Sequence, residues 1–279
     1  MRHDSVSAAQ MTWAWCPEKG LGMDLQLKDK VVLVTGGTGG IGTAIVKAFL
    51  AEGAKVAFSS TSQAKIDALL PELEGDVKGF VCDATQEEQV KQLVEDAKAA
   101  FGTLDVVVPN AGYEGKAGVV ADNETEETLK VYTLNVFSPL WLMKYASPTL
   151  VEKGEGAIVV LASAGSYTPT ATMHNYVSSK YAVSGLTKCV AQELMPQGVH
   201  VNYICPGPVD TDMMRRIERD QLGDAVPHEE AMAIFAGTAL DKRYATPKEV
   251  ADAVVFMASP VTAHTCGMGF NLDAIAPSC

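Results

Sequence analysis

The chain has 279 residues, of which 47% are hydrophobic and 20% charged, and its formal net charge at pH 7 is −12. This composition excludes disordered and fibrous proteins, and the length suffices to bury a full hydrophobic core. The acidic balance argues against a nucleic-acid partner, because phosphate backbones are bound by clustered Lys and Arg. An anionic cofactor would therefore need a local site.

Cysteine usage and hydropathy indicate a cytoplasmic protein with no metal and no membrane segment. The six cysteines are widely spread and include no CxxC pair, so neither a zinc site nor a disulfide scaffold is expected. Reduced thiols fit a cytoplasmic location. The N-terminus lacks an apolar run of signal-peptide length, and the internal apolar runs are far shorter than the ~20 residues that span a bilayer.

Short β-rich runs alternate with amphipathic helical segments from Lys30 onward. The strand runs are apolar on both faces and are separated by helices, and such strands form parallel sheets that helices cover on both sides. The sequence thus predicts an α/β, Rossmann-like, doubly wound parallel sheet. The expected strands are 31–35, 55–60, 78–84, 104–110, 156–163, 199–207 and one near 267–273, and the expected helices are 40–52, 63–73, 87–101, 125–152 with an interruption near Pro139, 176–195 and 247–257.

No linker or repeat divides residues 25–279, so we expect a single domain preceded by an N-terminal extension over 1–24. Trp13, Trp15 and Cys16 in this extension could dock on the domain or on a neighbouring subunit. The alternatives are a disordered tail, the common behaviour of chain termini, or an overlong start.

The first strand runs into a glycine-rich turn, VVLVTGGTGGIG at 31–42. A strand-to-helix turn is where a dinucleotide pyrophosphate meets a helix N-terminus, and glycines let backbone N–H groups approach the phosphate oxygens. The helix dipole favours their negative charge without a lysine. The spacing TGxxxGxG with no GK[ST] argues against a P-loop NTPase. Alone, the turn is also compatible with a tight turn that binds nothing.

A second cluster places Tyr176 and Lys180 at i and i+4, on one face of a helix. A phenol has a pKa of roughly 10, and an adjacent ammonium would lower this pKa towards the working pH. Ser163 follows a strand at the carboxyl edge of the sheet, where open α/β sheets bind ligands, so its hydroxyl could hold a substrate oxygen. Taken singly, each of these residues also fits an ordinary helix face or turn.

Together, TGGTGGIG (35–42), Ser163 and the Tyr-x-x-x-Lys motif resemble the classical short-chain dehydrogenase/reductase family, over nearly the whole chain from Leu25. The resemblance implies hydride transfer between a nicotinamide and a carbonyl or carbinol carbon, as in NAD(P)-dependent alcohol dehydrogenases and ketone reductases. It implies that Tyr176 passes the proton, that Ser163 orients the oxygen and that Lys180 also binds the nicotinamide ribose. Asn135 in TLNVFSP matches the residue that completes the family's tetrad and helps to place a water beside the lysine.

The resemblance also implies a set of cofactor-binding residues along the chain. Asp83 matches the aspartate at the adenine ring, and Val209 and Thr211 match residues that contact nicotinamide. The implied set is Gly36, Thr38, Gly39, Gly40, Ile41, Gly42, Ser60, Thr61, Asp83, Ala84, Asn110, Ala111, Gly112, Tyr176, Lys180, Pro206, Gly207, Val209 and Thr211.

The end of the second strand bears on the choice between NAD(H) and NADP(H). An acidic residue there accepts hydrogen bonds from the ribose 2′-hydroxyl and repels a 2′-phosphate. Ser60 holds this position and Thr61 follows, so the sequence favours NADP(H). NAD(H) stays open, because no arginine follows and Thr38 and Gly39 are uncharged. Alternatively, Ser60 and Thr61 only cap the next helix.

The segment of about 212–246 corresponds to the family's variable substrate loop. Met213, Met214, Ile217 and Leu222 could form an apolar lid over a bulky alcohol or ketone, or the packed face of a short helix. The expected substrate contacts are Ser163, Tyr176, Tyr113 and Met213, with Tyr167 and Met173 in the same cleft. A hydroxysteroid, a cyclic alcohol or a 3-oxoacyl thioester would each be compatible.

Two departures from the family pattern concern the ends of strands. Pro109 replaces the first asparagine of the family's NNAG, and we expect a local adjustment there, because proline cannot donate a sheet hydrogen bond. The C-terminal LDAIAPSC keeps Asp273 of a common D-G-G but lacks both glycines, which leaves the course of the tail open.

The resemblance implies a small-molecule partner and a homotetramer or homodimer packed through helices near 125–151 and 176–195. The alternative functions are a noncatalytic dinucleotide-binding regulatory relative and an epimerase or dehydratase of the extended family. The first is disfavoured because Asn135, Ser163, Tyr176 and Lys180 are all present, and the second because such chains are usually longer and have a different glycine spacing.

Overall fold

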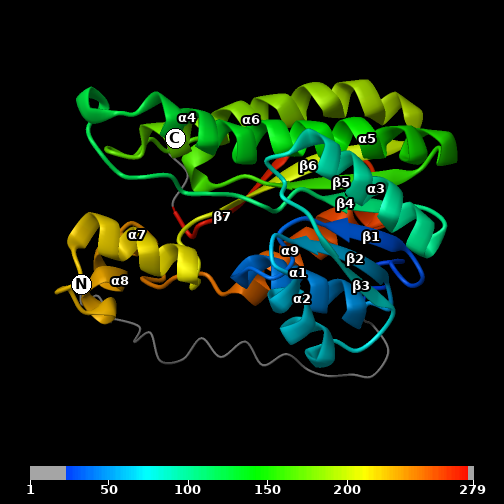
Figure 1. The fold of residues 1–279 in the computed structure, drawn as a ribbon, viewed down its shortest axis with the longest axis horizontal. Coiled ribbons are helices and arrows are strands. Elements are labelled where there is room, and N and C mark those ends of the chain that lie inside the picture. Colours follow the sequence, from blue (N-terminus) through cyan, green and yellow to red (C-terminus); the bar gives the residue numbers. More distant parts are fainter. Residues whose placement is uncertain (1–22, 276–279) are drawn as a thin grey trace, which may run out of the picture.

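Seven parallel strands form one central sheet in the computed structural model, which describes residues 23–275 (Figure 1). The strand order is β3-β2-β1-β4-β5-β6-β7, which confirms the predicted doubly wound fold. The predicted docking of Trp13, Trp15 and Cys16 lies outside the described residues. The strands are β1 (Val31–Val34), β2 (Lys55–Ser60), β3 (Val77–Val81), β4 (Val106–Val108), β5 (Gly156–Leu161), β6 (Val199–Pro206) and β7 (Gly269–Leu272).

Helices cover both faces of the sheet, and two further helices lie beyond its edge (Figure 1). One face carries α1 (Gly40–Ala51), α2 (Gln63–Leu69) and α9 (Pro247–Ala258). The other carries α3 (Glu87–Phe101), α5 (Ser138–Lys153) and α6 (His174–Leu194), with α4 (Thr125–Tyr132) packed against α6. The remaining helices, α7 (Asp212–Leu222) and α8 (His228–Phe235), contribute to a small separate cluster around Met214 and Tyr244.

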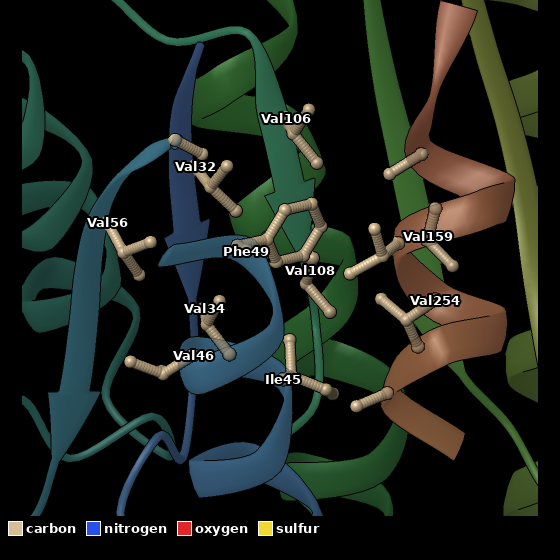
Figure 2. Close-up of a cluster of buried hydrophobic side chains, with 14 of the residues drawn as sticks. Val32, Val34, Ile45, Val46, Phe49, Val56, Val106, Val108, Val159 and Val254 are labelled. Atoms are coloured by element: carbon tan, nitrogen blue, oxygen red, sulfur yellow. The ribbon is translucent and has the colours of Figure 1, made fainter. Parts of the chain in front are cut away.

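The β1–α1 unit is held by apolar side chains that project from one face of the helix. Ile45, Val46 and Phe49 recur at helical spacing and are fully buried against β1 and its neighbours (Figure 2). Val32 and Val34 of β1 meet them from the sheet. Because this packing positions α1 rigidly, the N-terminus of the helix is held beside the carboxyl end of β1.

The interruption predicted near Pro139 is a π-helical turn over Thr133–Phe137, between α4 and α5. Pro139 has no N–H to donate to the carbonyl of Asn135, four residues earlier. The hydrogen bonding shifts to a five-residue spacing, in which the Ser138 N–H donates to the Thr133 carbonyl. Single π turns of this kind are frequent at functional sites.

Pro109 produces the local adjustment that the sequence predicts. β4 ends at Val108, directly before it. The Val108 carbonyl accepts from the Thr35 N–H at 3.2 Å and the Pro109 carbonyl from the Leu161 N–H at 2.9 Å, so both neighbouring strands remain tied to this one. The proline therefore shortens the strand without separating the sheet.

Candidate active site

Two cavities lie along the carboxyl edge of the sheet, where the strand order reverses between β1 and β4. The first, of about 450 Å³, follows the glycine-rich turn and the ends of β2 and β3. The second, of about 570 Å³, lies between the β5–α6 segment and the helices α7 and α8. Five residues line both cavities, which makes them adjoining parts of one cleft: Ile41, Asn110, Gly112, Thr211 and Met213.

The glycine-rich turn is shaped by close backbone approaches that leave no room for side chains. Gly36 has a φ of +67°, which favours glycine. A Cβ on Gly42 would lie 2.1 Å from the Gly36 carbonyl oxygen. No side chain caps α1 and its first turn carries no acidic residue, so its N-terminal N–H groups and dipole favour an anion in the cavity.

The ends of β1 and β4 are joined by hydrogen bonds between Thr35 and the Asn-Ala-Gly segment. The Thr35 hydroxyl oxygen accepts from the N–H groups of Asn110 at 3.0 Å and Ala111 at 3.2 Å. The Asn110 side-chain amide donates to the Thr35 carbonyl at 2.8 Å. These contacts fix the backbone where the two cavities meet.

Ser60 lies at the end of β2 and faces the glycine-rich turn. Its hydroxyl and that of Thr38 share a hydrogen bond of 2.8 Å. The cap of α2 is Ser62, whose hydroxyl accepts from the Lys65 N–H, so neither Ser60 nor Thr61 is the capping residue. Lys65, in the first turn of α2, also lines this cavity.

Ser163 and Tyr176 meet in the second cavity. Ser163 follows β5 in extended backbone, and its hydroxyl accepts from the Gly165 N–H at 3.1 Å. Tyr176, in the first turn of α6, lines the same cavity as Ser163. Burial raises the pKa of the Tyr176 phenol, the Ser163 hydroxyl lowers it, and the charge of Glu114 raises it further.

Lys180 lies one turn further along α6 and is buried. Its Nζ donates to the Leu161 carbonyl at 2.9 Å and lies 5.5 Å from the Tyr176 ring centroid. Burial lowers the pKa of Lys180 to about 8. The predicted lowering of the Tyr176 pKa by this ammonium is wrong for this structure, because burial disfavours the charged forms of both residues.

Asn135 does not line either cavity but lies behind the active-site wall. Its Oδ1 accepts from the Tyr113 N–H at 2.8 Å, and its Nδ2 donates to the Tyr113 carbonyl at 2.9 Å and to the Ser179 hydroxyl at 3.0 Å. The side chain is therefore fully used in joining the segment after β4 to α6. It positions Tyr113, which does line the second cavity.

The walls of the second cavity are largely apolar, and Lys180 is the one charged side chain among the described residues that line it. The predicted Met213, Met214, Ile217 and Met173 contribute, whereas Leu222 and Tyr167 do not. Leu222 is the last residue of α7. Tyr167 is absent from the wall because its hydroxyl donates to the Asp273 carboxylate instead.

The C-terminal tail reaches this cavity despite the missing glycines. Ala274 has a φ of +51°, the left-handed conformation that glycine adopts most easily, and its carbonyl accepts from the Leu240 N–H at 2.9 Å. Ile275 follows and lines the second cavity. The tail thus contributes to the same site as the substrate loop.

All nineteen cofactor residues expected from the sequence line one cavity or the other. The expected substrate contacts Ser163, Tyr176, Tyr113 and Met213 share the second. Sequence reasoning missed Lys65, Leu134 and Arg216, which line the first cavity. A lysine in the first turn after Ser60–Thr61 was a usable signal, whereas Leu134 and Arg216 reach the cavity only through tertiary packing.

The described residues contain no metal-ligating cluster of His, Cys, Asp and Glu, and none of their helices is long and apolar enough to cross a membrane.

A sequence model of the family described as short chain dehydrogenase matches residues 30–222. The chain belongs to this family. It is 36% identical over 251 residues to the 3-alpha-(or 20-beta)-hydroxysteroid dehydrogenase of Mycobacterium bovis, which covers 90% of each chain. It is also 33% identical over 257 residues to zerumbone synthase of Zingiber zerumbet, which covers 89% of this chain and 95% of the relative.

A solved structure of NAD⁺-bound xylitol dehydrogenase superposes with a TM-score of 0.83 at 27% identity, and the match covers 88% of this chain and 98% of that one. Membership of this family supports an oxidoreductase, and the xylitol dehydrogenase that it resembles is an NAD⁺-bound structure. Nothing in these similarities favours the noncatalytic alternative.

We expect Gly42→Ala to weaken dinucleotide binding roughly 5- to 150-fold, because overpacking of this size costs about 1–3 kcal/mol. The new methyl group would meet the Gly36 carbonyl, which is backbone and cannot rotate away. The measurement is a fluorescence titration with NADH and NADPH. Gly118→Ala is the matched control, because no atom lies within 4 Å of a Cβ there; equal affinities for the two variants would contradict the assignment of the turn.

Proposed function

We propose that this short-chain dehydrogenase interconverts a neutral, apolar secondary alcohol and its ketone. The observation that carries the proposal is that Ser163, Tyr176 and Lys180 together line a large cavity with mostly apolar walls. Tyr176 and Ser163 are the polar groups that would hold the reacting oxygen. The opposite wall, from α7 and α8, offers methionine, isoleucine and phenylalanine side chains.

In the proposed reaction the nicotinamide supplies or accepts the hydride, and the chain's own residues handle the oxygen and its proton. Ser163 donates a hydrogen bond to the substrate oxygen and orients it. Tyr176 gives its phenolic proton to the oxygen in reduction and takes it back in oxidation. Lys180, with a pKa of about 8, is able to exchange a proton near neutral pH, and its backbone contact with Leu161 holds it beside Tyr176.

The cavity favours a bulky neutral substrate over an anionic one. Its volume of about 570 Å³ falls within the range of sites for drug-sized ligands. Burying a carboxylate or phosphate against apolar walls without a partner cation is costly. The hydroxysteroid dehydrogenase relative, by its name, acts on a substrate of the favoured kind, so a hydroxysteroid or another cyclic alcohol is preferred to a 3-oxoacyl thioester.

We expect neutral cyclic ketones, including ketosteroids, to be reduced, and the corresponding alcohols oxidised, with higher kcat/KM than anionic ketones of similar size. The test is a substrate screen that follows oxidation and formation of NADH and NADPH. Tyr176→Phe should lower kcat by roughly 10²- to 10⁴-fold, the usual contribution of a positioned proton donor. The dinucleotide affinity of this variant should stay within about twofold, since no charge is lost. A Phe variant that keeps most of its activity would falsify the role of Tyr176.

We also propose that the enzyme prefers NADP(H) to NAD(H). No carboxylate occupies the end of β2, and the hydroxyls of Ser60 and Thr38 meet there at 2.8 Å. Lys65 adds a positive charge to the same cavity. An ammonium near hydroxyl groups favours a 2′-phosphate.

Lys65→Ala should therefore lower kcat/KM with NADP(H) by roughly 2- to 5-fold, the size of a partly exposed ion pair, and leave the value with NAD(H) unchanged. Lys47→Ala is the control, because Lys47, on α1, pairs with Glu72 and lies outside the cofactor cavity. A wild-type preference for NAD(H) at equal concentrations would overturn this proposal.

We propose further that the chain assembles as a homodimer or homotetramer through α4, α5 and α6. Large apolar side chains are exposed along these helices and the π turn between α4 and α5: Leu129, Phe137, Leu140 and Tyr181. Exposed apolar patches of this kind mark interaction surfaces.

Light scattering should give two or four times the 29.6 kDa mass of the chain, and Leu140→Glu should reduce the measured mass by placing a charge in the interface. A wild-type monomer at micromolar concentration would exclude the assembly.

A further inference from the structure

A bidentate ion pair joins the substrate loop to the segment after β4. The Arg216 Nε donates to the Glu114 Oε1 at 2.6 Å, and a second guanidinium nitrogen donates to Oε2 at 3.2 Å. The two residues are 102 positions apart in the chain. Fork-on-fork pairs of this type are geometrically specific as well as charge-assisted.

The pair connects the two rims of the cofactor cavity. Glu114 follows Asn110, Ala111 and Gly112, which line that cavity from the β4 side. Arg216 belongs to α7 on the β6 side and lines the same cavity, as does Met213 one helical turn before it. A dinucleotide bound along the glycine-rich turn would therefore lie beneath a helix that this ion pair holds to the opposite rim.

The Glu114 carboxylate is buried, so its charge requires the Arg216 guanidinium as a partner. The Glu114 side chain is only 4% exposed, whereas that of Arg216 is 47% exposed. A buried carboxylate without a cation is strongly disfavoured. Among residues 23–275, Arg216 is the one cationic side chain within 4 Å of the Glu114 carboxylate; the nearby Lys116 pairs with Glu124 instead.

The N-terminal end of the helix is anchored independently of this pair. The Thr211 hydroxyl accepts from the Met214 N–H at 3.4 Å, and Arg215 pairs with Asp210 and with the buried Glu218. Arg216 is the residue of α7 that crosses to the other rim, so its loss would free that connection and leave the internal contacts of the helix in place.

We propose that the Arg216–Glu114 pair is a clamp that holds α7 over the bound dinucleotide and slows its release. Arg216 and Glu114 are thus positioning residues, and neither takes part in hydride or proton transfer. The clamp rests on the proposed function only in that a nicotinamide dinucleotide occupies the cavity. It does not depend on the identity of the alcohol or ketone.

The experiment is a double-mutant cycle on dinucleotide release, measured by stopped-flow displacement of bound NADH or NADPH, whichever the wild-type enzyme binds more tightly. Arg216→Gln and Glu114→Gln should each speed release and raise the dinucleotide Kd by about 5- to 10-fold, and the double variant should show no more than the larger single effect. Arg216→Lys should retain part of the slow release, because lysine keeps the charge but not the fork.

Arg243→Gln is the matched control. Arg243 makes a bidentate pair with Glu249 at 2.7 and 2.8 Å, away from the cofactor cavity, so its loss should leave release unchanged. Should Arg216→Gln fail to fold because Glu114 is left buried and unpaired, the double variant removes both charges and provides the measurement.

The clamp is overturned if the double variant releases the dinucleotide at the wild-type rate, or if the two single effects multiply in the double variant. If the wild-type enzyme binds neither NADH nor NADPH, the proposed function fails together with the clamp. Wild-type binding with unchanged release in the variants removes the clamp alone.

Discussion

The parallel pairing of β1 with β4 is the constraint on which the site depends. This pairing is the point where the sheet order reverses, so the helices after β1 and β4 leave on opposite faces and open a cleft between them. Thr35 and Asn110 close the end of the pairing with hydrogen bonds. Because α1 is packed rigidly behind them through Phe49, the helix N-terminus and the Asn-Ala-Gly backbone face each other across a fixed gap.

Burial sets the protonation behaviour of Tyr176 and Lys180 on the second-cavity side of the cleft. Tyr176 and Lys180 lie on one helix beneath the apolar wall of the substrate loop, and burial shifts their pKa values in opposite directions, up for the phenol and down to about 8 for the amine. Burial thus disfavours the phenolate and the ammonium alike, while an amine with a pKa of about 8 stays largely protonated at neutral pH. A protonated phenol that can donate its proton is thereby held one helical turn from an amine that can exchange a proton near neutral pH.

The strand and helix segments and the Tyr-x-x-x-Lys motif were predictable from the sequence, because they depend on local patterns. Apolar runs such as 31–34 and 156–161 can only be buried strands in this context, and Tyr176 and Lys180 share a face at any regular helical spacing. The predicted pKa of Tyr176 was wrong because the depth of burial is a tertiary property. The same limit applies to Asn135, whose partners Tyr113 and Ser179 come from other segments, and to Arg216, whose partner Glu114 lies 102 positions away in the chain.

The tail offers a different kind of dependence between sequence and site. Ala274 holds a left-handed backbone conformation that costs an L-residue roughly 1–2 kcal/mol. Two hydrogen bonds keep it there: the Tyr167 hydroxyl donates to the neighbouring Asp273 carboxylate, and the Leu240 N–H donates to the Ala274 carbonyl. This strained residue directs Ile275 to the wall of the second cavity. The wall of the second cavity is consequently shaped in part by the C-terminal end of the chain, so a substitution there would change the cavity without altering Ser163, Tyr176 or Lys180.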